Sequence, residues 1–105
     1  MLAAALAFLA LAAAARAEVL TLLCTGAPQY GQTPVTVEVN LSNQTACIRF
    51  PGGPDCTSLG SVTVTDKAIT FHPRNSGNID RVTGAIQWAD GSAGTCKPAP
   101  AKPKF

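Results

Sequence analysis

Apolar and polar residues alternate along the segment Val35 to Ser42, which directly follows Pro34. The apolar positions hold valine and leucine, and the polar positions hold Thr36, Glu38, Asn40 and Ser42. A period of two places the two sets on opposite faces of an extended chain, so this segment predicts a strand with one buried face. The segments that we expect to form strands are Glu18 to Cys24, Val35 to Ser42, Gln44 to Phe50, Ser61 to Asp66, Ala68 to His72 and Asp80 to Asp90.

Turn-forming residues separate several of these segments, namely Asn43, the pair Asp66-Lys67, and the run Asn75-Ser76-Gly77-Asn78. Beyond residue 17, no window has apolar residues at the spacing of a helix face, so we expect almost no helix. Strands joined by short polar turns pair with their chain neighbours, and their apolar faces must cover one another. The sequence predicts an all-β fold, a small antiparallel meander barrel or sandwich of about six strands that is cross-linked by disulfides.

An apolar leader precedes the predicted strands. Leu2 to Ala15 is an unbroken apolar run, which is shorter than the roughly 20 residues that a transmembrane helix needs. Ala15 and Ala17 form the A-x-A pattern that precedes a signal-peptidase cut, here before Glu18. We expect a signal peptide. The alternatives are an Ala-rich helix packed in the fold and a lipid anchor on Cys24, and the leucine before that cysteine argues against the anchor.

The chain of 105 residues is long enough for one domain. We expect residues 1–17 to be the signal peptide, 18–97 the β domain, and 98–105 a C-terminal tail rich in Pro and Lys. Residues 97–105 read K-P-A-P-A-K-P-K-F, a composition that favours an extended conformation. This tail either docks a partner or lies against the domain through Phe105. We expect no membrane insertion after the leader is removed.

Four cysteines follow the leader, at positions 24, 47, 56 and 96. An even number in a short exported chain indicates disulfides, and three pairings are possible by count alone. Cys47 and Cys56 flank the turn sequence P-G-G-P, which could bring their sulfurs together, and a bond between Cys24 and Cys96 would then join the first strand to the last. Zinc ligands need closely spaced pairs such as C-x-x-C, which are absent, so we expect no metal.

Charge and motifs exclude several function classes. The formal net charge is +2 and only 13% of residues are charged, which gives no basis for binding nucleic acid. The sequence lacks the glycine-rich motifs of phosphate-binding and dinucleotide-binding loops, so we expect no cofactor.

His72 is the one candidate for acid–base chemistry. It lies on the polar parity of its predicted strand, where most histidines are ordinary surface residues. A small hydrolase would need a carboxylate such as Asp66 or Asp80 within hydrogen-bond reach of this ring. A distance above about 8 Å from His72 to every carboxylate and hydroxyl would remove this alternative.

The most unusual polar stretch contains a structural or binding motif formed by Ile79, Asp80, Arg81, Thr83 and Gly84. Asp80 has the parity of the apolar residues that follow it, so a buried carboxylate there would need partners. It would accept N–H groups of the preceding turn, pair with Arg74, or line a site. Gly84 predicts a bulge or a close backbone approach, for example beneath Trp88.

These stretches resemble small exported bacterial proteins of unknown function that have an early C-x-G, a late I-[DN]-R-x-T-G and a closing Cys…Phe end. The matching residues are Cys24-Thr25-Gly26, Ile79 to Gly84, and Cys96 to Phe105. The resemblance implies a compact β domain with a disulfide between its first and last cysteines, and it implies no activity. The pair Cys47 and Cys56 is a departure from it.

The sequence therefore favours a periplasmic or secreted β domain that is not an enzyme and binds another protein or an envelope component. One alternative is a structural accessory subunit, marked by an exposed apolar patch with Trp88 or Phe50 on the wet side. The other is the small hydrolase built on His72.

Overall fold

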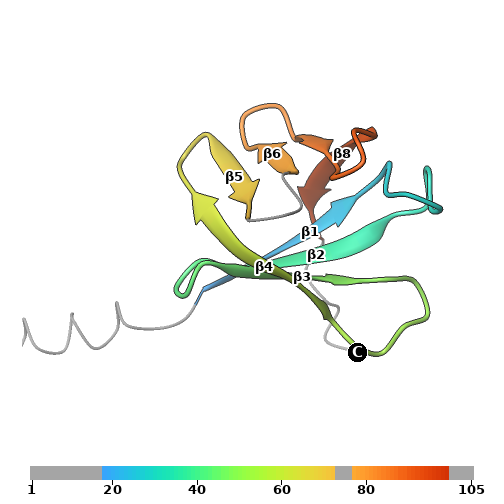
Figure 1. Cartoon of the computed structure of the whole chain (residues 1–105), viewed down its shortest axis with the longest axis horizontal. Helices are drawn as coiled ribbons and strands as arrows, with labels where there is room; N and C mark the ends of the chain where they lie inside the picture. Colours follow the sequence, from blue (N-terminus) through green and yellow to red (C-terminus); the bar gives the residue numbers. More distant parts are fainter. Residues whose placement is uncertain (1–17, 73–76, 100–105) are drawn as a thin grey trace, which may run out of the picture.

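The computed structural model describes residues 18–72 and 77–99, which form a closed antiparallel barrel of eight strands (Figure 1). Each strand pairs with its neighbours in the chain, and the last strand pairs with the first. The strands are β1 (Val19–Cys24), β2 (Val35–Asn40), β3 (Thr45–Arg49), β4 (Thr57–Val64), β5 (Ala68–Phe71), β6 (Asn78–Asp80), β7 (Ala85–Gln87) and β8 (Ala93–Pro98). The predicted all-β meander is confirmed, and of the two expected forms it is the barrel.

Some predictions concern residues that the structure does not describe. The predicted signal peptide, Arg74, half of the turn at 75–78 and most of the tail belong to residues 1–17, 73–76 and 100–105, which lie outside the described residues. Among the described residues, no helix has the length and hydropathy needed to cross a membrane.

The expected number of six strands was wrong. The segment expected as one strand from Asp80 to Asp90 holds the last residue of β6, a turn at residues 81–84 and the short strand β7. The turn forms because the Asp80 carboxylate accepts backbone N–H groups and Gly84 adopts a φ of +83°. The second missed strand, β8, reads A-G-T-C-K-P and lacks an alternating apolar pattern. Its partners β1 and β7 define it instead.

Alternation determines which side chains fill the barrel. Along β2, valines at positions 35, 37 and 39 are buried, and the residues between them are half-exposed. The buried apolar core consists of Leu22, Cys24, Ala27, Val35, Val37, Val39, Ala46, Ile48, Val62, Ile69, Phe71, Ile79 and Ile86. No charged residue is buried among the described residues, so the interior of the barrel is an apolar core.

The two predicted disulfides are present and lie on opposite sides of the barrel wall. Cys24 and Cys96 are directly opposed on β1 and β8, whose pairing closes the barrel and is called the seam below. Because Cys24 is fully buried, their bond crosses this seam on the inner side of the barrel wall. Cys47 is on the polar parity of β3 and bonds to Cys56 just before β4. Two disulfides are typical of proteins that reside outside the cytosol.

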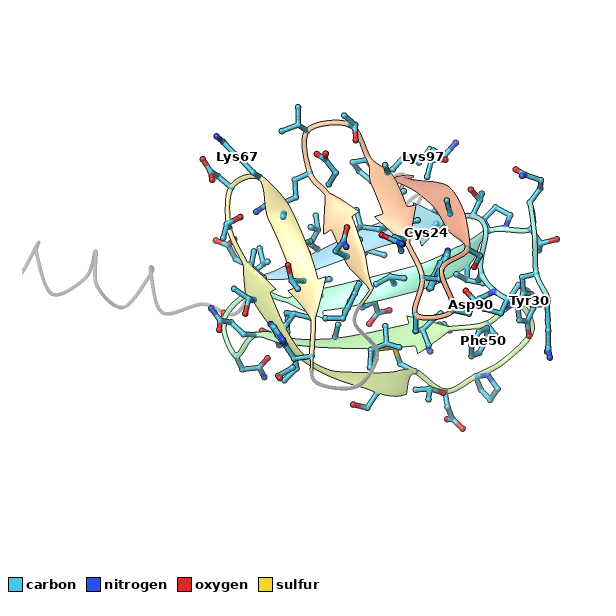
Figure 2. All side chains as sticks on the ribbon, turned by 45° about the horizontal axis from the view of Figure 1, so that its top comes forward. Cys24, Tyr30, Phe50, Lys67, Asp90 and Lys97 are labelled. Carbon is cyan, nitrogen blue, oxygen red and sulfur yellow. A yellow bond between two sulfur atoms is a disulfide. The ribbon has the colours of Figure 1, made fainter. Side chains whose placement is uncertain are left out.

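The two ends of the barrel differ, and we name them by their features. The pocket end carries the connections 25–34, 50–56, 72–77 and 88–92. The turn end carries the shorter connections 41–44, 65–67 and 81–84, together with Glu18 and Ala99. In Figure 2, Tyr30, Phe50 and Asp90 gather at the pocket end, and Lys67 lies at the opposite end.

Candidate functional site

An apolar pocket of about 220 Å³ opens at the pocket end. Its walls come from strand ends and from the connections beyond them. The lining residues are Ala27, Pro28, Ile48, Phe50, Leu59, Phe71, Gly77, Gln87, Trp88 and Ala89. Gln87 contributes the polar side chain of this set, and the remaining side chains are hydrocarbon or aromatic.

Strand geometry aims these side chains at the opening. Phe71 is the last residue of β5, and Phe50 and Trp88 directly follow β3 and β7 on the inward parity. Leu59 has no partner on β3, because the register shifts between Ala46↔Gly60 and Cys47↔Ser58. This β-bulge turns the Leu59 side chain toward the pocket. Large side chains therefore line the pocket just above the core.

Contacts between connections hold the aromatic residues in place. The Trp88 indole Nε1–H donates to the Thr25 carbonyl oxygen at 2.9 Å. The rings of Tyr30 and Phe50 stack with centroids 5.1 Å apart and planes inclined by 18°. No buried side-chain nitrogen or oxygen lacks a hydrogen-bond partner in the described part of the chain. The pocket is thus preformed, and its buried polar groups are already satisfied.

The charged residues that the structure describes on the connections of the pocket end are acidic. Among the described residues of the four connections at this end, Asp55 and Asp90 are charged, and Lys and Arg are absent. The Ser92 hydroxyl and backbone N–H donate to the Asp90 carboxylate and lower the pKa of this residue, so it is ionised at neutral pH. The described charges at this end would favour a ligand that carries positive charge beside an apolar group.

The motif Ile79 to Gly84 lies at the turn end, away from this pocket. Ile79 is buried and Asp80 is exposed, so the prediction that Asp80 faces the core was wrong. The alternation does not continue past Asp80 because the turn at 81–84 interrupts the strand. Backbone N–H groups of Thr83 and Val82 donate to the Asp80 carboxylate and lower its pKa. These groups belong to the following turn rather than to the preceding one. Asp80 acts as a turn acceptor.

Two other residues of the motif hold neighbouring segments together. The Arg81 guanidinium donates to the Thr65 carbonyl oxygen at 2.6 Å and so joins two turns. A Cβ at Gly84 would lie 2.6 Å from the Cys96 carbonyl oxygen. The predicted close backbone approach is confirmed, but the approaching segment is β8 rather than Trp88. These contacts connect the motif to the turn at 65–67 and to β8.

His72 is exposed and lies 2.8 Å from a hydroxyl, through its Nε2 and the Thr63 Oγ1. The distance criterion for removing the hydrolase alternative is therefore not met. Among the described residues, no carboxylate hydrogen-bonds to the His72 ring. A third group that would orient a catalytic base is not in place there.

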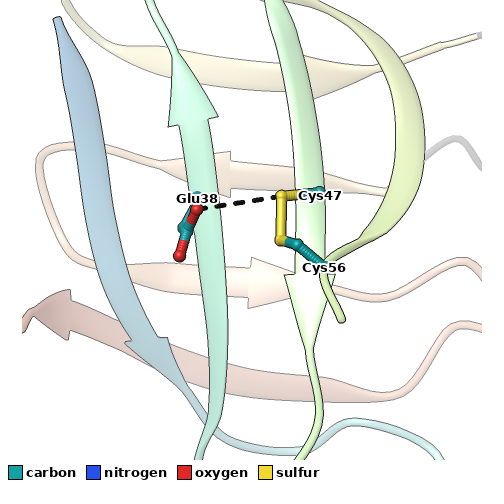
Figure 3. Close-up of side chains that lie close together, drawn as sticks. All are labelled: Glu38, Cys47 and Cys56. Carbon is teal, nitrogen blue, oxygen red and sulfur yellow. Dashed lines mark hydrogen bonds between the residues drawn. A yellow bond between two sulfur atoms is a disulfide. The ribbon is translucent and has the colours of Figure 1, made fainter. Parts of the chain in front are cut away.

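Glu38, Cys47 and Cys56 form the one cluster of possible metal ligands among the described residues (Figure 3). Glu38 Oε1 lies 3.9 Å from the Cys47 sulfur. This sulfur belongs to a disulfide and carries no proton, so the approach is a contact between a carboxylate and a sulfur. Metal ions bind thiolates, which the oxidised pair does not offer.

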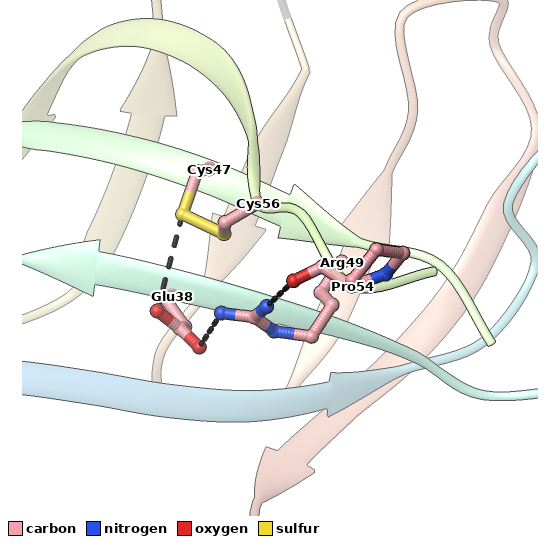
Figure 4. A network of polar contacts seen from close by, with 5 residues as sticks. All are labelled: Glu38, Cys47, Arg49, Pro54 and Cys56. Carbon is pink, nitrogen blue, oxygen red and sulfur yellow. Dashed lines mark hydrogen bonds and ion pairs between the residues drawn. A yellow bond between two sulfur atoms is a disulfide. The ribbon is translucent and has the colours of Figure 1, made fainter. Parts of the chain in front are cut away.

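Arg49 links this cluster to the connection that bears Phe50 (Figure 4). Its guanidinium pairs with Glu38 at 3.2 Å and donates to the Pro54 carbonyl oxygen at 2.7 Å. These bonds and the Cys47–Cys56 disulfide fix both ends of the connection at 50–56 to the barrel wall. They support one side of the pocket.

The sequence did not predict this pocket, and an exposed Trp88 or Phe50 was expected to mark a structural accessory subunit. Both are half-buried and pack against the core. The exposed large apolar residues of the described chain are Val19 and Val82 instead. The sequence does contain a signal for the pocket. Phe50 and Trp88 directly follow strands that end at the same end of the barrel, and both continue the inward-facing positions of those strands.

No protein-family model, curated protein or solved structure matches this chain.

Proposed function

We propose that this protein is a non-enzymatic binding module, exported by a cleaved signal peptide to the periplasm or secreted, whose pocket receives an aromatic side chain of a partner protein. The observation that carries the proposal is the preformed apolar pocket, with its fixed Trp88 and its stacked pair of Tyr30 and Phe50. Mouths of β-barrels are frequent ligand sites.

The size of the pocket suits a single ring. Apolar cavities of about 150 Å³ already accept benzene, and this pocket measures about 220 Å³. A free metabolite with several polar groups would lose hydrogen bonds to water here, because the lining offers few replacements. A side chain attached to a partner avoids that loss, since its main chain stays at the rim.

The acidic surroundings add a second requirement. Asp55 and Asp90 are exposed on two connections of the pocket end. Opposite charges across a rim speed association and select among partners. The preferred partner segment therefore has an aromatic residue flanked by Lys or Arg.

A direct test uses N-acetyl-phenylalaninamide, with N-acetyl-alaninamide as the control. Trp88 is the single tryptophan, so its fluorescence reports on the pocket. We expect saturable binding of the phenyl compound with a dissociation constant on the order of 1 mM, as is usual for a fragment of this size. The alanine compound should give no saturable change. Equal responses to both compounds would contradict the proposal.

A matched pair of variants locates the binding. Leu59→Asn places a polar group of similar size in the pocket, and Val64→Thr makes a comparable change near the other end of β4. We expect Leu59→Asn to weaken binding of the phenyl compound about tenfold and Val64→Thr to leave it unchanged. Nuclear magnetic resonance spectra would verify that both variants remain folded.

A further inference from the structure

The occupant of the pocket is itself present in this sequence. Residues 102–105 read Lys-Pro-Lys-Phe, an aromatic residue next to two cations. This is the chemistry that an apolar pocket with nearby Asp55 and Asp90 selects. We propose that the pocket of one molecule binds the phenyl ring of Phe105 from a second copy of this chain. The inference rests on the proposed function and names its partner.

Strand direction argues for a second copy over the same molecule. β8 runs from the pocket end to the turn end, where Pro98 is paired with Leu22 and the Ala99 N–H donates to the Thr21 carbonyl oxygen. Six residues beyond Ala99 can span at most about 22 Å. The strand β8 alone spans about 17–20 Å.

To reach its own pocket, the tail would have to reverse direction at once beside β1, and the extended conformation that its prolines favour opposes such a reversal. Entering the pocket from outside would require additional length. A neighbouring molecule imposes no such requirement, because its pocket end can approach the turn end of the first molecule. The geometry therefore favours binding between molecules.

Association of this kind is head-to-tail. The donor surface is at the turn end and the acceptor surface is at the pocket end, so each bound molecule leaves one donor and one acceptor free. Contacts between different surfaces extend into chains when the geometry does not close into a ring. We expect the mean mass to rise with concentration.

Sedimentation equilibrium of the purified, oxidised protein tests this inference. We expect association in the range of about 0.1–1 mM, weakening as salt screens the Lys and Asp charges. Phe105→Ala should be monomeric over this range. Val82→Ala, which removes an exposed apolar side chain from the turn end, should associate like the parent. Equal association of the parent and Phe105→Ala would overturn the proposal.

A mixing experiment gives the most specific evidence. Phe105→Ala retains the pocket and Leu59→Asn retains the tail, so each alone should be monomeric. Their mixture should form one-to-one dimers and nothing larger. Absence of these dimers would overturn the proposal when Leu59→Asn gives a native spectrum.

Tail variants remain informative if Leu59→Asn fails to fold. The double change Lys102→Glu with Lys104→Glu lies outside the barrel, and at low salt we expect it to weaken association about tenfold. An acetylated peptide of residues 99–105 should bind to Phe105→Ala and change the fluorescence of Trp88. A Phe-to-Ala version of this peptide is the control.

The outcomes separate this inference from the proposed function. Binding of N-acetyl-phenylalaninamide by a parent protein that stays monomeric would overturn the second-copy proposal and leave the binding function intact. The compound could also bind more tightly to the Phe105→Ala variant than to the parent when both are monomeric. That result would show that the tail occupies the pocket of its own molecule, and it would also overturn the second-copy proposal. If neither the compound nor the peptide binds, both proposals fail.

Discussion

The two ends of this barrel are held together by different kinds of contact. At the turn end, short connections are fixed by side chains a few residues away, as when the Asn40 carboxamide oxygen accepts the N–H groups of Ser42 and Asn43. At the pocket end, the connections are longer and hold one another through distant pairs, such as Trp88 with Thr25. Local contacts fix most of the turns at one end, where the bond from Arg81 to Thr65 adds a longer contact, and long-range contacts frame an apolar opening at the other.

Under the proposed function, this difference separates the part of the barrel that stabilises the fold from the part that binds a partner. A turn fixed by its own side chains exposes at most isolated apolar groups, such as Val82 in the turn at 81–84, and its residues contribute chiefly to folding. Connections that meet through aromatic contacts keep apolar surface partly uncovered, and such surface marks binding sites. We therefore expect substitutions at the turn end to change stability and substitutions in the pocket to change binding.

Both ends depend on the seam between β1 and β8, and its removal should have the largest effect. Replacing Cys24 and Cys96 by alanine frees a loop of 72 residues and should lower the free energy of unfolding by about 4 kcal/mol. The matched change of Cys47 and Cys56, 9 residues apart, should cost about 2–3 kcal/mol. Urea denaturation measures both. A larger loss of stability on replacing Cys47 and Cys56 would contradict the conclusion that the bond between Cys24 and Cys96 holds the barrel closed.

The next largest effect compares one glycine from each end. Gly84→Ala at the turn end combines a φ of +83° with a Cβ placed 2.6 Å from the Cys96 carbonyl oxygen, so we expect a loss of about 3 kcal/mol. Gly52→Ala at the pocket end has a φ of +78° and open space around it, and should cost about 1 kcal/mol. Thermal unfolding of the two variants tests the difference. Equal losses of stability would show that the β8 backbone moves away from Gly84 to accommodate the added methyl group.

Acid titration compares Asp80 at the turn end with Asp90 at the pocket end. Hydrogen bonds lower the pKa of both groups, from Thr83 and Val82 to Asp80 and from Ser92 to Asp90. Each group therefore stabilises the fold above its unfolded pKa of about 3.9, and this contribution disappears as the pH falls through the lower folded value.

The variants Asp80→Asn and Asp90→Asn keep an acceptor oxygen and remove the charge. Each should flatten the decline of the melting temperature below about pH 4. Asp80→Ala should also lower the melting temperature at neutral pH, because it removes the turn acceptor. Unaltered pH dependence in both Asn variants would mean that these carboxylates do not contribute to acid unfolding.

The smallest expected effect concerns the ion pair on the outer wall. Glu38 and Arg49 are about one-third exposed, so Glu38→Gln should change the free energy of unfolding by less than about 1 kcal/mol. Urea denaturation and binding of N-acetyl-phenylalaninamide measure its effect on stability and on the pocket. A large loss of binding without a loss of stability would show that this pair controls the connection at 50–56.

The accuracy of the sequence prediction depended on the strength of the local pattern. The strand at Val35 was predicted because four apolar positions alternate there, and the barrel confirms it. The break after Asp80 was missed because the sequence pattern is the same for an aspartate at the start of a strand and for one that ends a strand. Only the structure shows that the Asp80 carboxylate accepts N–H groups of a turn. The strand β8 was missed because Gly94 and Cys96 supply little apolar signal at its inward positions.

The sequence was enough to predict the all-β class and the pairing of neighbouring strands, and it favoured one of the three possible cysteine pairings. Alternation, turn residues and the spacing of Cys47 and Cys56 are local properties that hold in any arrangement of the chain. The tertiary structure alone decided that the sheet closes between β1 and β8, and that Phe50, Leu59 and Trp88 meet around one opening. These features depend on strand register and on curvature accumulated over eight strands, and no short window of sequence contains either of them.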